Sequence, residues 1–179
     1  MEINFTNVNF EKDISLPENI QTLNNDIKKI CNELPALNIV KDVSLLDYTI
    51  QQTEKFKRNN RNFVVFGTGG SNLGARALIN TQTKQPKNIL FFDNIDPLFF
   101  QDEIINLDLN TTGFIIISKS GTPPETLSQF GSIINIAREK NNLDMLFKNC
   151  LVVTEFKDSP LFNIAEKNKC TLLEHKKDI

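Results

Sequence analysis

The feature that most constrains this chain is the stretch Phe63–Arg76, where a short apolar run breaks into four glycines. The run Phe63–Phe66 has the β-branched and aromatic residues of a buried strand. The glycines surround Ser71, and a segment suited to a helix begins at Asn72. Glycine lets a ligand approach the main chain closely, and a helix start presents free N–H groups and a positive dipole end. The stretch therefore predicts a phosphate-binding loop.

The glycine spacing argues against the two common nucleotide loops. A dinucleotide fingerprint, G-x-G-x-x-G, requires a third glycine where Asn72 stands. The P-loop spacing fits Gly69 and Gly74, but Ala75 follows in place of the lysine. A nucleotide alternative rests only on Asp93, which ends the second expected strand where a ribose-binding acid sits in dinucleotide folds. The loop suits a small phosphorylated ligand better.

Composition narrows the class of protein. The chain has 179 residues, 40% hydrophobic and 23% charged, which is typical of one globular domain. A net charge of −2 argues against a broad surface for nucleic acid. No apolar run approaches the roughly 20 residues that span a bilayer, and the N-terminal residues lack the pattern of a signal peptide. We expect a cytoplasmic protein that binds neither nucleic acid nor membrane.

Cysteine and histidine are too sparse for a disulfide framework or a metal centre. Cys31, Cys150 and Cys170 are odd in number and widely spaced, which indicates reduced, mostly buried thiols. The single histidine, His175, is interpreted as an ordinary surface or partly buried residue. We predict no metal and no cofactor.

The first sixty residues predict helices. One helix is expected to open at Pro17, with apolar residues at three- and four-residue steps, and to end at Pro35. A second is expected to begin at Ser44, with Asp47 completing a weak capping box. Its predicted core-facing residues are Leu46, Ile50 and Phe56.

After residue 62 the pattern changes to strands that alternate with helices. The expected strands are Phe63–Phe66, Asn88–Phe92, Gly113–Ile117, Cys150–Thr154 and Thr171–Leu173. Continuous apolar strands between helices imply a parallel sheet covered on both faces. We predict an α/β fold, a three-layer αβα sandwich with a five-stranded parallel sheet of flavodoxin-like order 2-1-3-4-5. Residues 1–60 would form a helical segment that packs on the domain formed by residues 61–179.

The loop after the third expected strand carries a second set of phosphate donors. Its residues are Ser118, Lys119, Ser120, Gly121 and Thr122. A helix is expected next, with Thr122 as N-cap, Pro123 first and Glu125 third. Each residue alone is explained as well by a turn, a cap or solvent exposure. In a sheet of order 2-1-3-4-5, however, ligands bind at the carboxyl ends of strands one and three, which these two loops follow.

Two motifs in these loops are similar to those of a known family. The segments FGTGGSNLG, from Phe66, and ISKSGTPPETL, from Ile117, resemble the sugar isomerase (SIS) fold and, more narrowly, the glucose-6-phosphate isomerase family. Further similarity lies in Val152–Thr154, Lys157–Leu161 and Glu174–Ile179. The resemblance covers roughly residues 40–179.

The resemblance implies a site for the phosphate of a sugar phosphate. By position, the phosphate-binding residues would be Gly70, Ser71, Ser118, Lys119, Ser120, Gly121 and Thr122. Pro123 stands where many relatives have a threonine, so one hydroxyl donor would be missing.

The resemblance also implies an isomerase activity, the interconversion of glucose 6-phosphate and fructose 6-phosphate in glycolysis and gluconeogenesis. This reaction needs a carboxylate base, a histidine, an arginine and a second lysine, which relatives carry further along the chain. We therefore expect the catalytic residues downstream of Ile179, in a second SIS domain. The expected partners are a phosphosugar and either a second copy, in a homodimer, or the missing C-terminal half. The alternatives are a stand-alone sugar-phosphate-binding SIS module and a non-catalytic truncated remnant.

Overall fold

The chain divides into two compact units, residues 1–41 and 42–179, and the computed structural model describes residues 20–81 and 88–179. In the first unit the described residues form α1 (Ile20–Glu33), α2 (Pro35–Asn38) and a short 3-10 helix (Ile39–Lys41). The predicted helix start at Pro17 lies outside the described residues. Pro35 follows the end of α1 as predicted and opens α2, because its fixed φ suits the first helical position.

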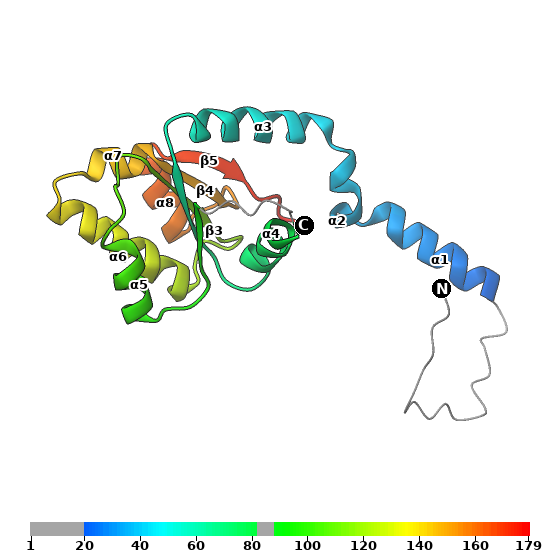
Figure 1. Ribbon diagram of the computed structural model, residues 1–179. Helices are drawn as coiled ribbons and strands as arrows, with labels where there is room; N and C mark the ends of the chain where they lie inside the picture. The colour runs from blue at the N-terminus through cyan, green and yellow to red at the C-terminus, as the bar shows by residue number, and fades with distance from the viewer. Residues whose placement is uncertain (1–19, 82–87) are drawn as a thin grey trace, which may run out of the picture. The chain divides into compact units, whose positions relative to one another are not determined.

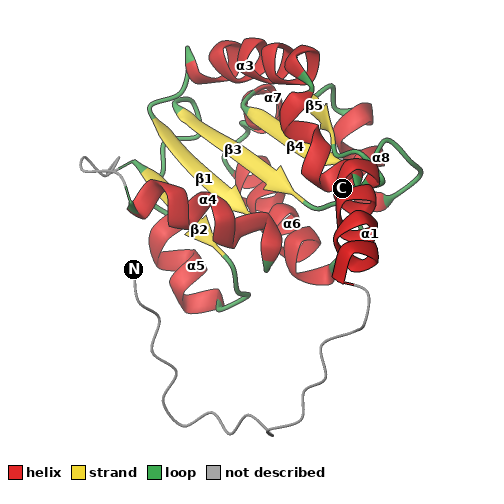
Figure 2. Ribbon diagram, turned by 90° about the vertical axis from the view of Figure 1, so that its right-hand side faces the viewer, coloured by secondary structure: helices red, strands yellow, loops and turns green. Residues whose placement is uncertain are grey.

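The second unit is built on a five-stranded parallel sheet of order β2-β1-β3-β4-β5 (Figure 2). Its strands are β1 (Asn62–Phe66), β2 (Ile89–Phe92), β3 (Thr112–Ile117), β4 (Cys150–Thr154) and β5 (Thr171–Glu174). The predicted strands, their order and the α/β fold class are confirmed. The order reverses between β1 and β3, whose carboxyl ends are therefore the expected place for a ligand.

Helices cover both faces of this sheet (Figure 1). They are α3 (Val43–Lys57), α4 (Gly70–Asn80), α5 (Pro97–Ile104), α6 (Pro124–Glu139), α7 (Leu143–Lys148) and α8 (Pro160–Lys167). Helices α5 to α8 contribute to the larger core cluster, with side chains such as Ile104, Phe130 and Leu161. On the other face, Phe56 of α3 packs on Leu151 and neighbouring strand residues.

Aromatic rings anchor the strand that precedes the glycine loop. The ring of Phe66 lies 5.7 Å from that of Phe92, 6.0 Å from Phe100 and 6.2 Å from Phe114, measured between centroids. Phe66, Phe92 and Phe114 are fully buried. Aromatic pairs at such spacings add about 0.5–1.5 kcal/mol beyond the burial of their area. The packing therefore holds the carboxyl end of β1, and with it the start of the loop.

The N-cap of α3 differs from the prediction. The helix begins at Val43, and the carboxylate of Asp42, rather than a capping box from Ser44, accepts a hydrogen bond of 2.9 Å from the Leu45 N–H. Lys176 pairs with the same carboxylate at 2.7 Å. The hydrogen bond from Lys176, followed by that from Leu45, lowers the pKa of Asp42. The cap itself is local and two residues before the predicted one, whereas the ion pair with Lys176 joins residues far apart in the sequence.

The buried face of α3 also differs. Phe56 is buried as predicted, but Leu46 and Ile50 are exposed, so their prediction as core residues is wrong. Ile50 and Phe56 are six positions apart, and at 3.6 residues per turn this spacing puts them on different faces of the helix. The structure groups α3 with the sheet in the unit that begins at Asp42. The boundary predicted between residues 60 and 61 stays a prediction.

Gly113 in β3 gives Phe56 room to cover the sheet. A Cβ atom on Gly113 would lie 2.6 Å from Cζ of Phe56 and 3.0 Å from Nδ2 of Asn60. We expect Gly113→Ala to lower the free energy of unfolding by about 1–3 kcal/mol, because a packed site must shift to accept the methyl group. Urea denaturation measures the change. Gly131→Ala in α6, where a Cβ would meet nothing within 4 Å, is the control; equal stability of both variants would contradict the prediction.

Two further observations concern the residues 20–81 and 88–179. No helix in these ranges is long and apolar enough to cross a membrane, and no three His, Cys, Asp or Glu side chains group as a metal site. The cysteines are free thiols, with Cys150 and Cys170 buried and Cys31 exposed.

Candidate phosphate-binding site

A hollow of about 370 Å³ lies at the carboxyl ends of β1 and β3. Its lining residues are Thr68, Ser71, Ile117, Ser118, Lys119, Ser120, Pro123 and Glu155. Four residues of the predicted site are thus brought together in one wall, namely Ser71, Ser118, Lys119 and Ser120. The remaining three, Gly70, Gly121 and Thr122, lie in the same two loops but are not among the lining residues.

The first loop joins β1 to α4. The helix begins at Gly70, two residues before the predicted start, after Gly69 with φ +53°. Glycine adopts this left-handed angle at no steric cost. Asn72, predicted only as a helix start, is buried and donates from Nδ2 to the main-chain oxygen of Gly67 at 3.1 Å. That bond ties the helix to the end of the strand and so holds Ser71 at the edge of the hollow.

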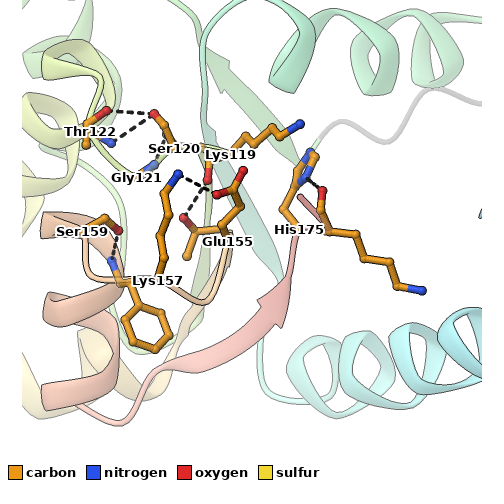
Figure 3. Close-up of polar contacts among 12 residues, drawn as sticks. Lys119, Ser120, Gly121, Thr122, Glu155, Lys157, Ser159 and His175 are labelled. Carbon is orange, nitrogen blue, oxygen red and sulfur yellow. Dashed lines mark hydrogen bonds and ion pairs between the residues drawn. The ribbon is translucent and has the colours of Figure 1, made fainter. Parts of the chain in front are cut away.

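The second loop joins β3 to α6, and its polar groups bond to one another. Ser118 is buried, and its Oγ accepts a hydrogen bond of 3.1 Å from the Gly121 N–H. The hydroxyl groups of Ser120 and Thr122 lie 2.9 Å apart and share a hydrogen bond (Figure 3). Gly121 has φ +70°, and its oxygen accepts from the Leu161 N–H at 3.2 Å. These bonds give the loop one defined conformation.

The start of α6 differs from its prediction by one residue. Pro123, not Thr122, is the N-cap, and the helix begins at Pro124 with Glu125 in its first turn. Because proline has no N–H group, two backbone donors that a helix start normally offers are missing here. An anion at this loop must therefore rely mainly on side-chain donors. The prediction was one residue early because a threonine before two prolines can be the N-cap itself or the residue that precedes the N-cap.

Lys119 provides the positive charge. Of the described residues that line the hollow, it alone carries a cationic side chain. Its main-chain oxygen accepts from the Glu155 N–H at 3.1 Å and from Oγ1 of Thr154 at 3.3 Å, which fixes the backbone between β3 and β4. The ammonium group donates to the main-chain oxygen of Ile179.

Glu155 is a lining residue that the sequence reasoning missed. Oε2 of its carboxylate forms an ion pair with Nζ of Lys157 at 2.6 Å (Figure 3). The Glu155 side chain is only 13% exposed. The hydrogen bond from Lys157 chiefly lowers the pKa of Glu155, and the nearby Lys119 and His175 act in the same direction. The carboxylate therefore stays ionised at neutral pH. The available signal was its position directly after β4, the neighbour of β3.

The nucleotide alternative rests on Asp93, and the carboxylate of this residue already has an ion-pair partner. The Asp93 carboxylate, which would bind a ribose, accepts from Nη1 of Arg76 at 2.8 Å. Asp93 is also absent from the described lining of the hollow.

The single histidine, His175, is half-buried after β5. Its Nδ1 atom lies 3.1 Å from the main-chain oxygen of Lys176.

Similar proteins of known family match this part of the chain. Residues 47–174 match the model of the phosphoglucose isomerase family. A probable glucose-6-phosphate isomerase of Methanococcus maripaludis is 31% identical over 134 residues, which cover 68% of this chain and 31% of that protein. The glucose-6-phosphate isomerase of Treponema denticola is 38% identical over 103 residues, 56% of this chain and 19% of that protein. The chain thus spans less than a third of the length of these two relatives.

Solved structures share the fold at lower sequence identity. A hypothetical protein from Thermus thermophilus superposes with a TM-score of 0.66 at 20% identity, over 90% of this chain and 42% of that one. A glucose-6-phosphate isomerase from Chlamydia trachomatis superposes with a TM-score of 0.59 at 21% identity, over 76% of this chain and 28% of that one. The residues of the family match include both loops and every lining residue of the hollow. The chain belongs to the phosphoglucose isomerase family.

Proposed function

We propose that this chain is the N-terminal SIS domain of a glucose-6-phosphate isomerase and that it binds the phosphate group of the substrate. The observation that carries the proposal is that one hollow is lined by one lysine, Lys119, and by four residues with hydroxyl groups, which are Thr68, Ser71, Ser118 and Ser120. Hydroxyl and ammonium groups donate, and phosphate oxygens only accept, so the two sets are complementary. The small net charge of −2 is no obstacle, because these donors act locally.

Each predicted residue has a distinct role in this proposal. Ser118 accepts a bond from Gly121, so the proton of its own hydroxyl remains available for a phosphate oxygen. Thr122 acts through the shared hydrogen bond that orients Ser120. Gly70 contributes the first N–H of α4, at the positive end of the helix.

The chemistry of a second hollow supports the choice of site. A hollow of about 390 Å³ lies among α6, α7 and α8. None of its described lining residues carries a hydroxyl group; they are Ile134, Arg138, Leu143, Phe147, Asn163, Ile164, Lys167 and Asn168. Size alone does not distinguish the two hollows, whereas the donor groups do.

Catalysis requires more than this hollow offers. Isomerisation needs a base that moves a proton between two carbons of the open sugar, and such a base works best with a pKa near the working pH. The carboxylate among the described lining residues is Glu155, whose pKa the Lys157 hydrogen bond lowers. We therefore expect the base, the histidine and the arginine of the reaction to come from polypeptide beyond these 179 residues.

Titration of the chain with phosphosugars tests the proposal. Glucose 6-phosphate at 100 times its Kd is expected to stabilise the fold by about 2.7 kcal/mol, which thermal unfolding detects. Lys119→Met is expected to weaken binding about 10- to 100-fold, since hydrogen bonds to charged groups contribute about 1.5–3 kcal/mol. Lys167→Met in α8 serves as the charge-matched control.

Two results would count against the proposal. If neither glucose 6-phosphate nor fructose 6-phosphate stabilises the chain, the proposed phosphate site is wrong. If Lys119→Met binds with an unchanged Kd, Lys119 is not the cation that binds the phosphate. Isomerase activity of this chain alone would instead show that its own residues include the base.

A further inference from the structure

Glu155 lies between two hollows at the carboxyl edge of the sheet. It lines the hollow of about 370 Å³ that holds the phosphate donors. It also lines a neighbouring hollow of about 410 Å³, whose other residues are Phe156, Lys157, Glu174, His175 and Lys177. A ligand whose phosphate occupies the first hollow and whose remaining atoms extend toward the second must pass this carboxylate.

The carboxylate of Glu155 is held in place. Two main-chain hydrogen bonds fix the backbone of Glu155. Its N–H donates to the main-chain oxygen of Lys119 at 3.1 Å, and its main-chain oxygen accepts from the Lys157 N–H at 2.9 Å. The side-chain oxygen Oε2 is paired with Nζ of Lys157 at 2.6 Å. Among the described residues, no hydrogen bond reaches the other carboxylate oxygen, Oε1. One oxygen is thus fixed by the protein, and the other has capacity to accept.

A fixed carboxylate is the wrong group for a phosphate and the right group for a hydroxyl. The phosphate dianion of a sugar phosphate and a carboxylate are both negative and only accept hydrogen bonds, so they repel. A sugar hydroxyl donates, and a hydrogen bond to a charged acceptor is about twice as strong as one between neutral groups. The one hydroxyl group of the inorganic phosphate dianion sits on the phosphorus atom itself, so inorganic phosphate has no hydroxyl group that extends beyond the first hollow toward Glu155.

We infer that Glu155 is a specificity-determining residue, whose carboxylate accepts a hydrogen bond from a hydroxyl of the sugar while the serines and Lys119 hold the phosphate. The inference rests on the proposed function. Lys157 is then a positioning residue, because its ion pair of 2.6 Å with Oε2 holds the Glu155 carboxylate in the wall of the hollow. The site as a whole favours a phosphate ester that carries hydroxyl groups over inorganic phosphate.

Two substitutions separate the acceptor of Glu155 from its charge. Glu155→Leu removes both, and Glu155→Gln removes the charge but keeps a neutral acceptor. Calorimetric titration with glucose 6-phosphate is expected to show a Kd about tenfold higher in Glu155→Leu and severalfold higher in Glu155→Gln. The Kd for inorganic phosphate is expected to fall severalfold in both, because a repelling charge is gone. Glu139→Gln, at an exposed position in the last turn of α6, should leave both Kd values unchanged.

The outcomes are distinguishable. Opposite shifts for the two ligands support the inference, because a merely structural role would move both in the same direction. Tighter binding of both ligands would show that Glu155 only repels, and unchanged Kd values would show that it touches neither; each result overturns the inference. Should the wild-type chain bind inorganic phosphate as tightly as glucose 6-phosphate, the inference fails and the phosphate site stands. If it binds neither, the proposed function fails as well.

Discussion

Replacing Gly121 by alanine is expected to lower the free energy of unfolding by about 2–5 kcal/mol and to weaken phosphosugar binding. Gly121 has φ +70°, an angle that costs an alanine roughly 1–2 kcal/mol. A Cβ atom would also lie 2.3 Å from Oγ and 2.9 Å from Cβ of Ser159, and overpacking of this kind costs about 1–3 kcal/mol. Binding suffers because the Gly121 N–H orients Ser118.

The geometry around Ser159 allows the two causes to be separated. Ser159 is buried and caps α8, since its Oγ accepts from the Phe162 N–H at 3.3 Å. In a double-mutant cycle, Ser159→Gly should recover part of the loss in Gly121→Ala, because it removes the clash but not the backbone strain. Gly74→Ala in α4, where a Cβ meets nothing within 4 Å, is the control and should be neutral or slightly stabilising. Urea denaturation gives all the values, and a Gly121→Ala variant as stable as Gly74→Ala would refute this account.

Ser71→Asp is expected to reduce the affinity for glucose 6-phosphate more than 100-fold while leaving the fold intact. Ser71 lines the hollow from the first turn of α4. An aspartate there puts a carboxylate against the bound phosphate and removes a donor. The same carboxylate is favourable for the helix, because negative charge near a helix N-terminus contributes about 0.3–1 kcal/mol. If Ser71→Asp loses affinity for glucose 6-phosphate but keeps its stability, the loss therefore arises at the binding site and not from unfolding.

Calorimetry and thermal unfolding on the same samples check this result. Ser128→Asp introduces the same charge at an exposed position on α6 and should bind as the wild type does. Ser71→Ala should weaken binding by about tenfold or more, because it removes one hydrogen bond to a charged acceptor, which contributes about 1.5–3 kcal/mol. Wild-type affinity in Ser71→Asp would exclude Ser71 from the site and move the phosphate elsewhere.

Much of the fold is predictable from local pattern in this chain. The five strands are continuous apolar runs, and such runs between helical segments specify a parallel sheet whatever its surroundings. The exact start of a helix, which depends on a single capping residue, was predicted less accurately. The caps of α3 and α6 were each placed wrongly, by one residue at Pro123 and by the missed role of Asp42. Several residues near a helix start can serve as the N-cap, and the backbone conformation at the helix start determines which of them does.

The candidate site divides in the same way. Ser71, Ser118, Lys119 and Ser120 stand in two short motifs directly after strands, so their presence at one sheet edge followed from the predicted strand order. Glu155 stands in no such motif. Its place in the hollow depends on the pairing of β3 with β4, where Ile117 is in register with Val153, and on the ion pair with Lys157.

Local sequence patterns predict the class of fold, the edge of the sheet where a ligand is expected and the polar residues that two loops bring there. These follow from periodicity, glycine and hydroxyl residues, which act over a few positions. Long-range packing sets which side chains share the hollow, brings Gly121 against Ser159, and adds the Glu155 carboxylate to the lining formed by the two loops. Such facts depend on contacts between residues that lie far apart in the chain, and these contacts exist only once the sheet has formed.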